Sequence, residues 1–191
     1  VSYPFDFPLN SWTHIAVSQT GSEVKLYVNG QVVATNNAVT MHPTDLGATT
    51  QNYLGKSQYN DPLLNGLVDE FRIYNGELDK FQIAASDEAG PNATNLNVGS
   101  FSSFDLNVGK MPLGLNTSSQ MTAYLSFSLA TNVNVTGDPN LTLTSDNPSV
   151  FTVDSTGLIK ATGAGTATLT GVYDYVADNT TNSYTNSAVV S

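Results

Sequence analysis

Two neighbouring carboxylates, Asp69 and Glu70, lie in a stretch with the pattern of a β-strand, Leu67–Tyr74. Glycoside hydrolysis needs two carboxyl groups that face one another across the sugar, roughly 5 to 9.5 Å apart. Neighbouring residues of a strand point to opposite faces of the sheet. Asp69 and Glu70 therefore cannot act as such a pair, and we expect no catalytic residue in this chain and no enzymatic activity of its own.

Histidine is the other common acid–base residue, and the chain has two, His14 and His42. His14 lies in the strand-like stretch Thr13–Ser18, and His42 lies in a loop. The sequence holds no G-x-S-x-G nucleophile elbow. We expect His14 to be a packed or edge residue of a sheet, while the abundance of Ser and Asp leaves a Ser-His-Asp site open.

Asp69 is also a candidate for a structural role. By strand alternation it shares the apolar face with Leu67, Phe71 and Ile73, whereas Glu70 lies on the opposite face. An unpaired carboxylate buried in such a face costs several kcal/mol. We therefore expect Asp69 to be paired with a cation, hydrogen bonded or bound to a metal ion.

The candidate ligand-binding residues are Tyr53, Tyr59, Asn60 and Asp61, which lie in or beside a predicted turn at 55–62. An aromatic ring stacks on the C–H face of a sugar, while amides and carboxylates hydrogen bond to its hydroxyls. This interpretation makes a polysaccharide or glycan the partner. The alternative is that Tyr53 packs inside a β-sandwich and that Tyr59 is a plain loop residue.

Short strands joined by turns make up the first part of the sequence. We predict strands at Thr13–Ser18, Glu23–Val28, Gln31–Thr35, Asn52–Gly55 and Leu67–Tyr74. In the second of these, apolar and polar side chains alternate with the period of two of a half-buried strand. It ends in an Asn-Gly pair, which favours a type I′ hairpin.

One short helix is predicted near residues 79–86. Asp79 can cap its start, and Gln82 completes a capping box. A Gly-Pro pair and few apolar residues follow, which indicates a linker. The predicted division is a first domain at 1–88, a linker at 89–95 and a second domain at 96–191.

The second domain is predicted to be built of strands as well. Thr166–Val172 alternates, with Ala167, Leu169 and Gly171 on one face and threonines on the other. Turn signals such as Ser155-Thr156-Gly157 recur at the spacing of a small β-sandwich, and Gly157 suits a positive-φ position. The predicted fold class is therefore all-β, with two sandwiches and one short helix.

The composition excludes several functions. A net charge of -10 with six Lys and Arg residues would repel a phosphate backbone, so we expect no nucleic acid partner. No apolar run is long enough to span a membrane. Cysteine is absent, which excludes disulfides and thiolate metal sites. The low charged fraction, 12%, is typical of extracellular β-proteins.

Four blocks of the first domain resemble the laminin G-like, concanavalin A-like jelly-roll family. They are Trp12-Thr13-His14-Ile15-Ala16-Val17, Val24-Lys25-Leu26-Tyr27-Val28-Asn29-Gly30, Asn52-Tyr53-Leu54-Gly55-Lys56-Ser57 and Asn65-Gly66-Leu67-Val68-Asp69-Glu70-Phe71-Arg72-Ile73-Tyr74. The resemblance implies only the C-terminal half of that fold. We therefore expect the partner strands to lie in upstream domains of the same polypeptide, and Val24, Leu26, Leu67 and Phe71 to form an exposed apolar patch.

Three runs of the second domain resemble a group 2 bacterial Ig-like domain. They are Leu143-Thr144-Ser145-Asp146-Asn147-Pro148-Ser149-Val150-Phe151-Thr152-Val153-Asp154, followed by Gly157-Leu158-Ile159, and Gly163-Ala164-Gly165-Thr166-Ala167-Thr168-Leu169. In proteins of this kind the Ig-like domain often serves as a spacer and the jelly roll as a carbohydrate-binding or adhesive module.

The two resemblances together imply a non-catalytic carbohydrate-binding or adhesive accessory region of a larger secreted protein. They point to a polysaccharide-degrading enzyme as the parent and to an extracellular or cell-surface location. The alternative is a structural spacer or a surface adhesin segment without glycan binding. In similar jelly rolls the acid equivalent to Asp69 helps to hold a structural calcium ion, so the resemblance implies calcium as a partner of Asp69. The alternative is that Asp69 accepts hydrogen bonds from backbone N–H groups.

Overall fold

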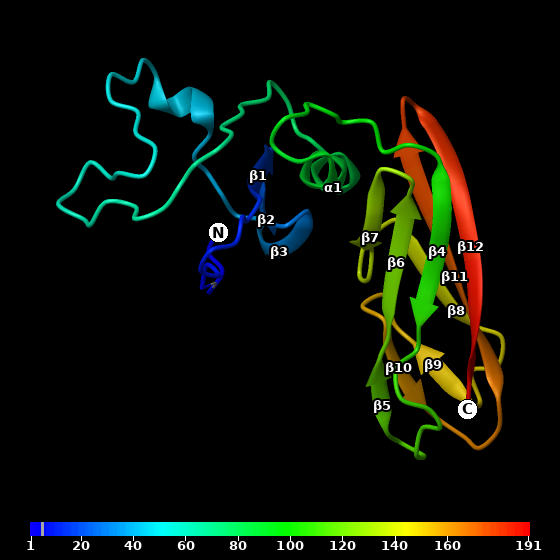
Figure 1. The fold of residues 1–191 in the computed structure, drawn as a ribbon. Coiled ribbons are helices and arrows are strands. Elements are labelled where there is room, and N and C mark those ends of the chain that lie inside the picture. Colours follow the sequence, from blue (N-terminus) through cyan, green and yellow to red (C-terminus); the bar gives the residue numbers. More distant parts are fainter. Residues whose placement is uncertain (5) are drawn as a thin grey trace. The chain divides into compact units, whose positions relative to one another are not determined.

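The computed structural model describes residues 1–4 and 6–191 (Figure 1). It divides the chain into unit 1, Val1–Val98, and unit 2, Gly99–Ser191. Both units are built on antiparallel sheets, which confirms the all-β class, and one α-helix lies among the described residues. No helix in this described part is long and apolar enough to cross a membrane.

Unit 1 contains one small sheet of three antiparallel strands, β1 (Ile15–Thr20), β2 (Glu23–Val28) and β3 (Gln31–Asn36). The first three predicted strands are confirmed to within two residues. Positive φ angles at Asn29 (47°) and Gly30 (71°) close the β2–β3 hairpin, as the Asn-Gly pair predicts. Local alternation and turn chemistry are therefore sufficient to specify this sheet.

The other two predicted strands of unit 1 are wrong. After a short 3₁₀ helix, η1 (Pro43–Leu46), no strand forms at Asn52–Gly55 or at Leu67–Tyr74. A β-strand needs a neighbouring strand to accept and donate its backbone hydrogen bonds. The described residues provide no such neighbour for these two stretches.

The predicted apolar patch forms only in part. Leu67 is 80% exposed and Phe71 61% exposed, because the stretch that carries them is not part of a sheet. Val24, by contrast, is buried on β2, and Leu26 is half-buried. Exposed apolar side chains of unit 1 therefore occur in the unpaired segment and also on the small sheet, where Val17 of β1 is 62% exposed.

Helix α1 (Lys80–Ala89) follows the unpaired segment. Asp79 caps it by accepting hydrogen bonds from the backbone N–H groups of Phe81 and Gln82, both at 2.8 Å. The Gln82 side chain accepts the backbone N–H of Asp79 in return, at 3.1 Å. This confirms the predicted capping box.

The helix runs three residues beyond its predicted end at residue 86. It ends before Gly90, whose φ of 73° only glycine adopts without strain. Its buried residues are Phe81, Ile83, Ala84, Ala85 and Ser86. The apolar run stops at Ala85, so the sequence pattern predicts a shorter helix than the one that forms.

Helix α1 packs closely against the β2–β3 hairpin at Gly30. A Cβ atom added to Gly30 would lie 3.1 Å from Cα of Ala84 and 3.3 Å from Oδ2 of Asp87. The same glycine has a positive φ angle. Gly30 thus serves both the hairpin turn and the docking of the helix.

Unit 2 consists of three antiparallel three-stranded sheets, with strand orders β4-β6-β7, β12-β11-β8 and β5-β10-β9 (Figure 1). The strands are β4 (Phe101–Asn107), β5 (Ser118–Gln120), β6 (Thr122–Phe127), β7 (Ala130–Asn134), β8 (Leu141–Ser145), β9 (Phe151–Val153), β10 (Leu158–Ala161), β11 (Ala167–Ala177) and β12 (Thr180–Val190).

The β11–β12 hairpin is the longest element of unit 2, with 11 residues in each strand. The predicted alternation is confirmed, because Ala167, Leu169 and Gly171 are all buried while the residues between them are not. Gly171 leaves room for Leu106 of β4, since a Cβ there would lie 3.0 Å from a Leu106 methyl carbon. The inner face of this hairpin is therefore one wall of the unit 2 core.

Aromatic rings seal one part of that core. Phe101 and Tyr184 stack with ring centroids 4.0 Å apart, and Phe127 lies 4.7 Å from Tyr175. The side chain of Asn186 donates a hydrogen bond to the backbone oxygen of Phe104 on β4, at 2.6 Å. Such contacts join β4 and β6 to β11 and β12 by side chains that are distant in sequence.

The turn between β9 and β10 is organised by one carboxylate. Asp154 Oδ1 accepts hydrogen bonds from the Thr156 hydroxyl (2.7 Å), the Thr156 backbone N–H (2.9 Å) and the Leu158 backbone N–H (3.0 Å). Gly157 has a φ of 84°, which confirms the positive-φ position predicted for it. These hydrogen bonds, that of the Thr156 hydroxyl first, lower the pKa of Asp154 below its ordinary value.

We expect Gly30→Ala to destabilise unit 1 by about 2 to 3 kcal/mol, because the methyl group adds contact with Ala84 to the cost of a positive φ. Gly21→Ala is the matched control, since Gly21 has a φ of 54° but no atom within 4 Å of an added Cβ. It should cost only about 1 kcal/mol. Urea unfolding followed by the fluorescence of Trp12, the single tryptophan of the chain, measures unit 1. Equal losses in the two variants would contradict the docking of α1 at Gly30.

We expect Thr156→Val to raise the pKa of Asp154 towards its ordinary value, because the variant removes the hydroxyl donor. A lowered folded-state pKa stabilises unit 2 above the unfolded value of about 3.9, and this contribution is lost as the pH falls through the folded pKa. Carbon-detected NMR titration of the carboxyl group measures the change. Thr162→Val is the control, since that hydroxyl donates to the Pro148 oxygen instead. An unchanged Asp154 pKa in Thr156→Val would refute the assignment.

Candidate functional site

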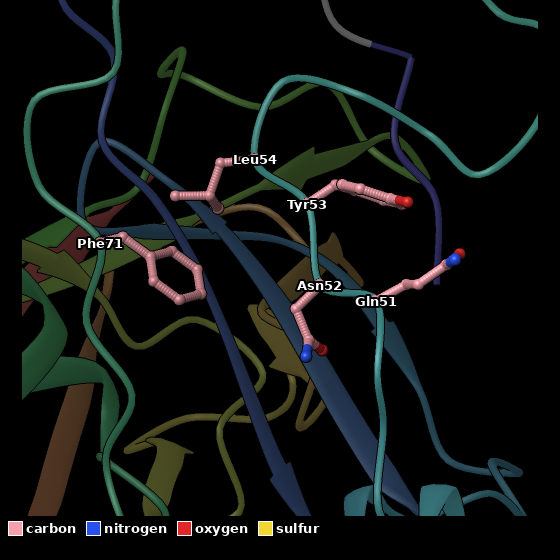
Figure 2. Close-up of a pocket in the computed structure, with 5 residues that line it drawn as sticks. All are labelled: Gln51, Asn52, Tyr53, Leu54 and Phe71. Atoms are coloured by element: carbon pink, nitrogen blue, oxygen red, sulfur yellow. The ribbon is translucent and has the colours of Figure 1, made fainter.

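A cavity of about 490 Å³ lies in the unpaired segment of unit 1. Four consecutive residues, Gln51, Asn52, Tyr53 and Leu54, line it together with Phe71. Figure 2 shows Phe71 approaching from a separate stretch of the chain. All five lining residues are exposed, so the cavity is an open depression of the surface and not an enclosed site.

The lining of this cavity combines apolar and amide groups. Tyr53, Leu54 and Phe71 provide apolar surface, and Gln51 and Asn52 provide amide donors and acceptors (Figure 2). A sugar presents a C–H face and a rim of hydroxyls, which such a lining can contact and hydrogen bond. The cavity can therefore accept a polar, uncharged ligand by stacking and hydrogen bonding.

Two neighbouring side chains orient this lining. The Thr49 hydroxyl donates to Oδ1 of Asn52 at 3.0 Å, which directs the Asn52 amide nitrogen away from it. Lys56 Nζ lies over the Tyr53 ring, 4.9 Å from its centroid, in cation–π geometry. One face of the Tyr53 ring is thus already in contact with a cation, and only the other face is left to stack on a ligand.

The structure separates the four residues predicted to bind ligand. All four are exposed, but only Tyr53 lines the cavity, and Tyr59, Asn60 and Asp61 lie in the following turn. Ser57 organises that turn, because its hydroxyl donates to Asp61 Oδ2 (2.6 Å) and accepts from the Tyr59 backbone N–H (2.9 Å). Ligand binding by the four residues stays a prediction.

Sequence reasoning did not identify Gln51, Asn52, Leu54 or Phe71 as lining residues. Three of them lie within two residues of Tyr53, and this closeness to an aromatic candidate is the feature of the sequence that could have identified them. Phe71 was assigned to the apolar face of a strand that does not form. Phe71 reaches the same cavity as Tyr53 through the path of the chain between them, and this path cannot be predicted from periodicity.

The environment predicted for Asp69 is not realised. Asp69 is exposed and does not lie in a buried apolar face. Its neighbour Glu70 accepts a hydrogen bond from Nε of Arg72 at 3.2 Å, and Arg72 also donates to the backbone oxygen of Pro91. Among the described residues no three His, Asp or Glu side chains come together as metal ligands. The residues present here do not by themselves fit a calcium ion, and the calcium prediction at Asp69 remains a prediction.

The two histidines lie apart from the cavity lining. His14 precedes β1 and lies near Asp87 of α1, with 3.7 Å between His14 Nδ1 and Asp87 Oδ1. His42 Nδ1 lies 3.2 Å from Nε2 of Gln19. Neither contact is to a serine hydroxyl, the group that a Ser-His-Asp site would place beside the imidazole.

Comparison with known proteins relates the chain to longer ones. It is 28% identical over 162 residues to an alpha-L-arabinofuranosidase of Bifidobacterium longum subsp. longum, an alignment that covers 84% of this chain and 13% of that protein. A crystal structure of an S-layer domain-containing protein (residues 221–444) from Clostridium thermocellum is 32% identical over 44% of this chain and 42% of its own, with a TM-score of 0.37.

The family comparison concerns unit 1. The Ig-like assignment of unit 2 stays a prediction. Residues 1–84 match the family model of the concanavalin A-like lectin/glucanases superfamily, and this match supports the jelly-roll assignment of the first part of the chain.

Proposed function

We propose that this chain is a non-catalytic, carbohydrate-binding accessory region of a larger secreted protein. The observation that carries the proposal is the match of residues 1–84 to a superfamily whose description names lectins and glucanases. The cavity lined by Tyr53 and Phe71 supports it, because it lies within the matched residues. Its ligand would be a sugar unit of a polysaccharide.

The chemistry of the cavity favours a neutral sugar. Its lining residues are uncharged, and the chain as a whole carries a net charge of -10. Acidic polysaccharides are repelled by such a field unless local cations offset it. One cation beside the lining, Lys56, is engaged with the Tyr53 ring.

The parent protein, on this proposal, is a polysaccharide-degrading enzyme at or outside the cell surface. The chain spans 13% of the length of the curated relative it matches, which is named as an alpha-L-arabinofuranosidase. The matched region is a small part of that protein, which is what we expect of an appended module rather than of the catalytic domain. Glycans with arabinofuranosyl side groups are therefore the first ligands to test.

A second candidate, a structural spacer or surface adhesin segment, is favoured for unit 2. The outer face of its β11–β12 hairpin carries hydroxyl side chains that satisfy one another or a neighbouring acid. Thr170 and Ser187 are 3.1 Å apart, and Ser183 donates to Asp174. Side chains paired in this way stiffen a sheet and leave fewer groups to bind a partner.

We expect the chain to be retarded in gels that contain arabinoxylan, and Tyr53→Ala and Phe71→Ala each to weaken binding roughly tenfold, or about 1.4 kcal/mol, through loss of stacking surface. Affinity electrophoresis and calorimetry measure this.

Leu46→Ala, which removes an exposed apolar side chain outside the cavity lining, should bind as the parent chain does. Tyr59→Ala tests the predicted turn separately from the cavity. If a correctly folded chain is retained by none of arabinoxylan, arabinan, xylan and galactan, the spacer function replaces the carbohydrate-binding one.

We expect the chain to release no sugar from these polysaccharides. Asp69 and Glu70 are adjacent in sequence, and Glu70 is committed to Arg72, so they do not form an opposed pair. Reducing-sugar release over a long incubation measures this. Turnover that is lost in Glu70→Gln or Asp69→Asn would overturn the non-catalytic assignment.

A further inference from the structure

His14 is held on the β2–β3 hairpin where helix α1 covers it. Its backbone N–H donates to Oδ1 of Asn29 at 3.0 Å, and the Asn29 backbone N–H donates to the His14 oxygen at 2.9 Å. The next residue, Gly30, packs against Ala84 and Asp87 of α1. The backbone of His14 is therefore fixed beside the hairpin turn that packs on the C-terminal half of the helix.

The imidazole of His14 and the carboxylate of Asp87 face one another across this junction. Nδ1 of His14 lies 3.7 Å from Oδ1 of Asp87, and each side chain is less than one third exposed. Nδ1 itself is buried and has no hydrogen-bond partner among the described residues. The separation is longer than an N–H···O hydrogen bond, so the pair is in position but not closed.

The protonation state of the imidazole decides what this pair does. A neutral ring can carry its proton on Nε2, which directs the Nδ1 lone pair at the carboxylate, or on Nδ1, which offers the carboxylate only an uncharged donor. An imidazolium presents an N–H there and can close a charge-assisted hydrogen bond with a small movement. We propose that His14 and Asp87 form a pH-sensitive clasp that holds α1 on the sheet of unit 1 more tightly in mildly acidic medium than in alkaline medium.

Within the described part of unit 1, few other charged groups surround the His14–Asp87 pair. Glu88 neighbours Asp87 on α1, the hairpin turn contributes only the neutral Asn29, and β3 carries no charged residue. On β2, Lys25 and Glu23 pair with each other.

The carboxylate sets the acid limit of the clasp. Burial raises the pKa of Asp87, the His14 cation lowers it, and Glu88 raises it. The clasp needs an ionised Asp87 and a protonated imidazole, and histidine ordinarily gains its proton near pH 6.5. Its contribution to stability is therefore lost in alkaline medium, where a histidine ring is neutral, and lost again as Asp87 becomes protonated.

A double-mutant cycle on the whole chain tests the proposal. The parent chain, His14→Asn, Asp87→Asn and the double variant are unfolded in urea at about pH 5.5 and about pH 8.5, on either side of the histidine titration, with Trp12 fluorescence reporting unit 1. We expect the coupling between positions 14 and 87 to change the folding equilibrium roughly two- to fivefold at the lower pH and to vanish at the higher pH. Coupling that is equal at both pH values, or absent at both, would overturn the proposal.

A second measurement examines the pair in the folded chain, without unfolding it. NMR titration of the Asp87 carboxyl in the parent chain and in His14→Asn should show a higher Asp87 pKa in the variant, because the cation that lowers it is gone. His42→Asn removes the only other histidine, which contacts Gln19, and should leave the Asp87 pKa unchanged. An Asp87 pKa that does not respond to His14→Asn, or that responds equally to His42→Asn, would refute the clasp.

Discussion

Backbone hydrogen bonding between strands is the constraint on which the structure of this chain depends. In unit 2 the described strands all have antiparallel partners, and their alternating side chains enclose a core. In unit 1 only β1, β2 and β3 are paired. Residues 47–79 contain stretches with strand-like sequences but no partner, so their apolar side chains remain exposed. An alternating side-chain pattern favours the extended conformation of a strand, but the strand forms only where a neighbouring strand completes its backbone hydrogen bonds.

The candidate site is a consequence of the same constraint. Its lining residues are held by local contacts within the unpaired segment and not by a sheet. The Leu64 backbone N–H donates to the Gly55 oxygen at 2.8 Å, which closes the turn after Tyr53, and Thr49 orients Asn52. A sugar that stacks on Tyr53 and Phe71 would join two parts of this segment.

What the sequence predicts well is what short-range chemistry determines. The Asn29-Gly30 hairpin, the Asp79–Gln82 capping box and the alternation of β11 each follow from residues within a few positions of one another. The strand at Leu67–Tyr74 was predicted with the same logic and is wrong, because its pairing depends on distant backbone. Tyr53 was identified as a candidate from its type and its neighbours, whereas Phe71 reaches the cavity through a fold of the chain that no local pattern encodes.

Residue-level mapping of ligand binding tests the central claim most directly. The chain, labelled with ¹⁵N, would be titrated with an arabinoxylan oligosaccharide, and the backbone amide shifts followed through the titration. Our account predicts saturable shifts centred on residues 51–54 and Phe71, with unit 2 unaffected. Shifts confined to residues 99–191, or no shifts at all in a folded chain, would contradict it.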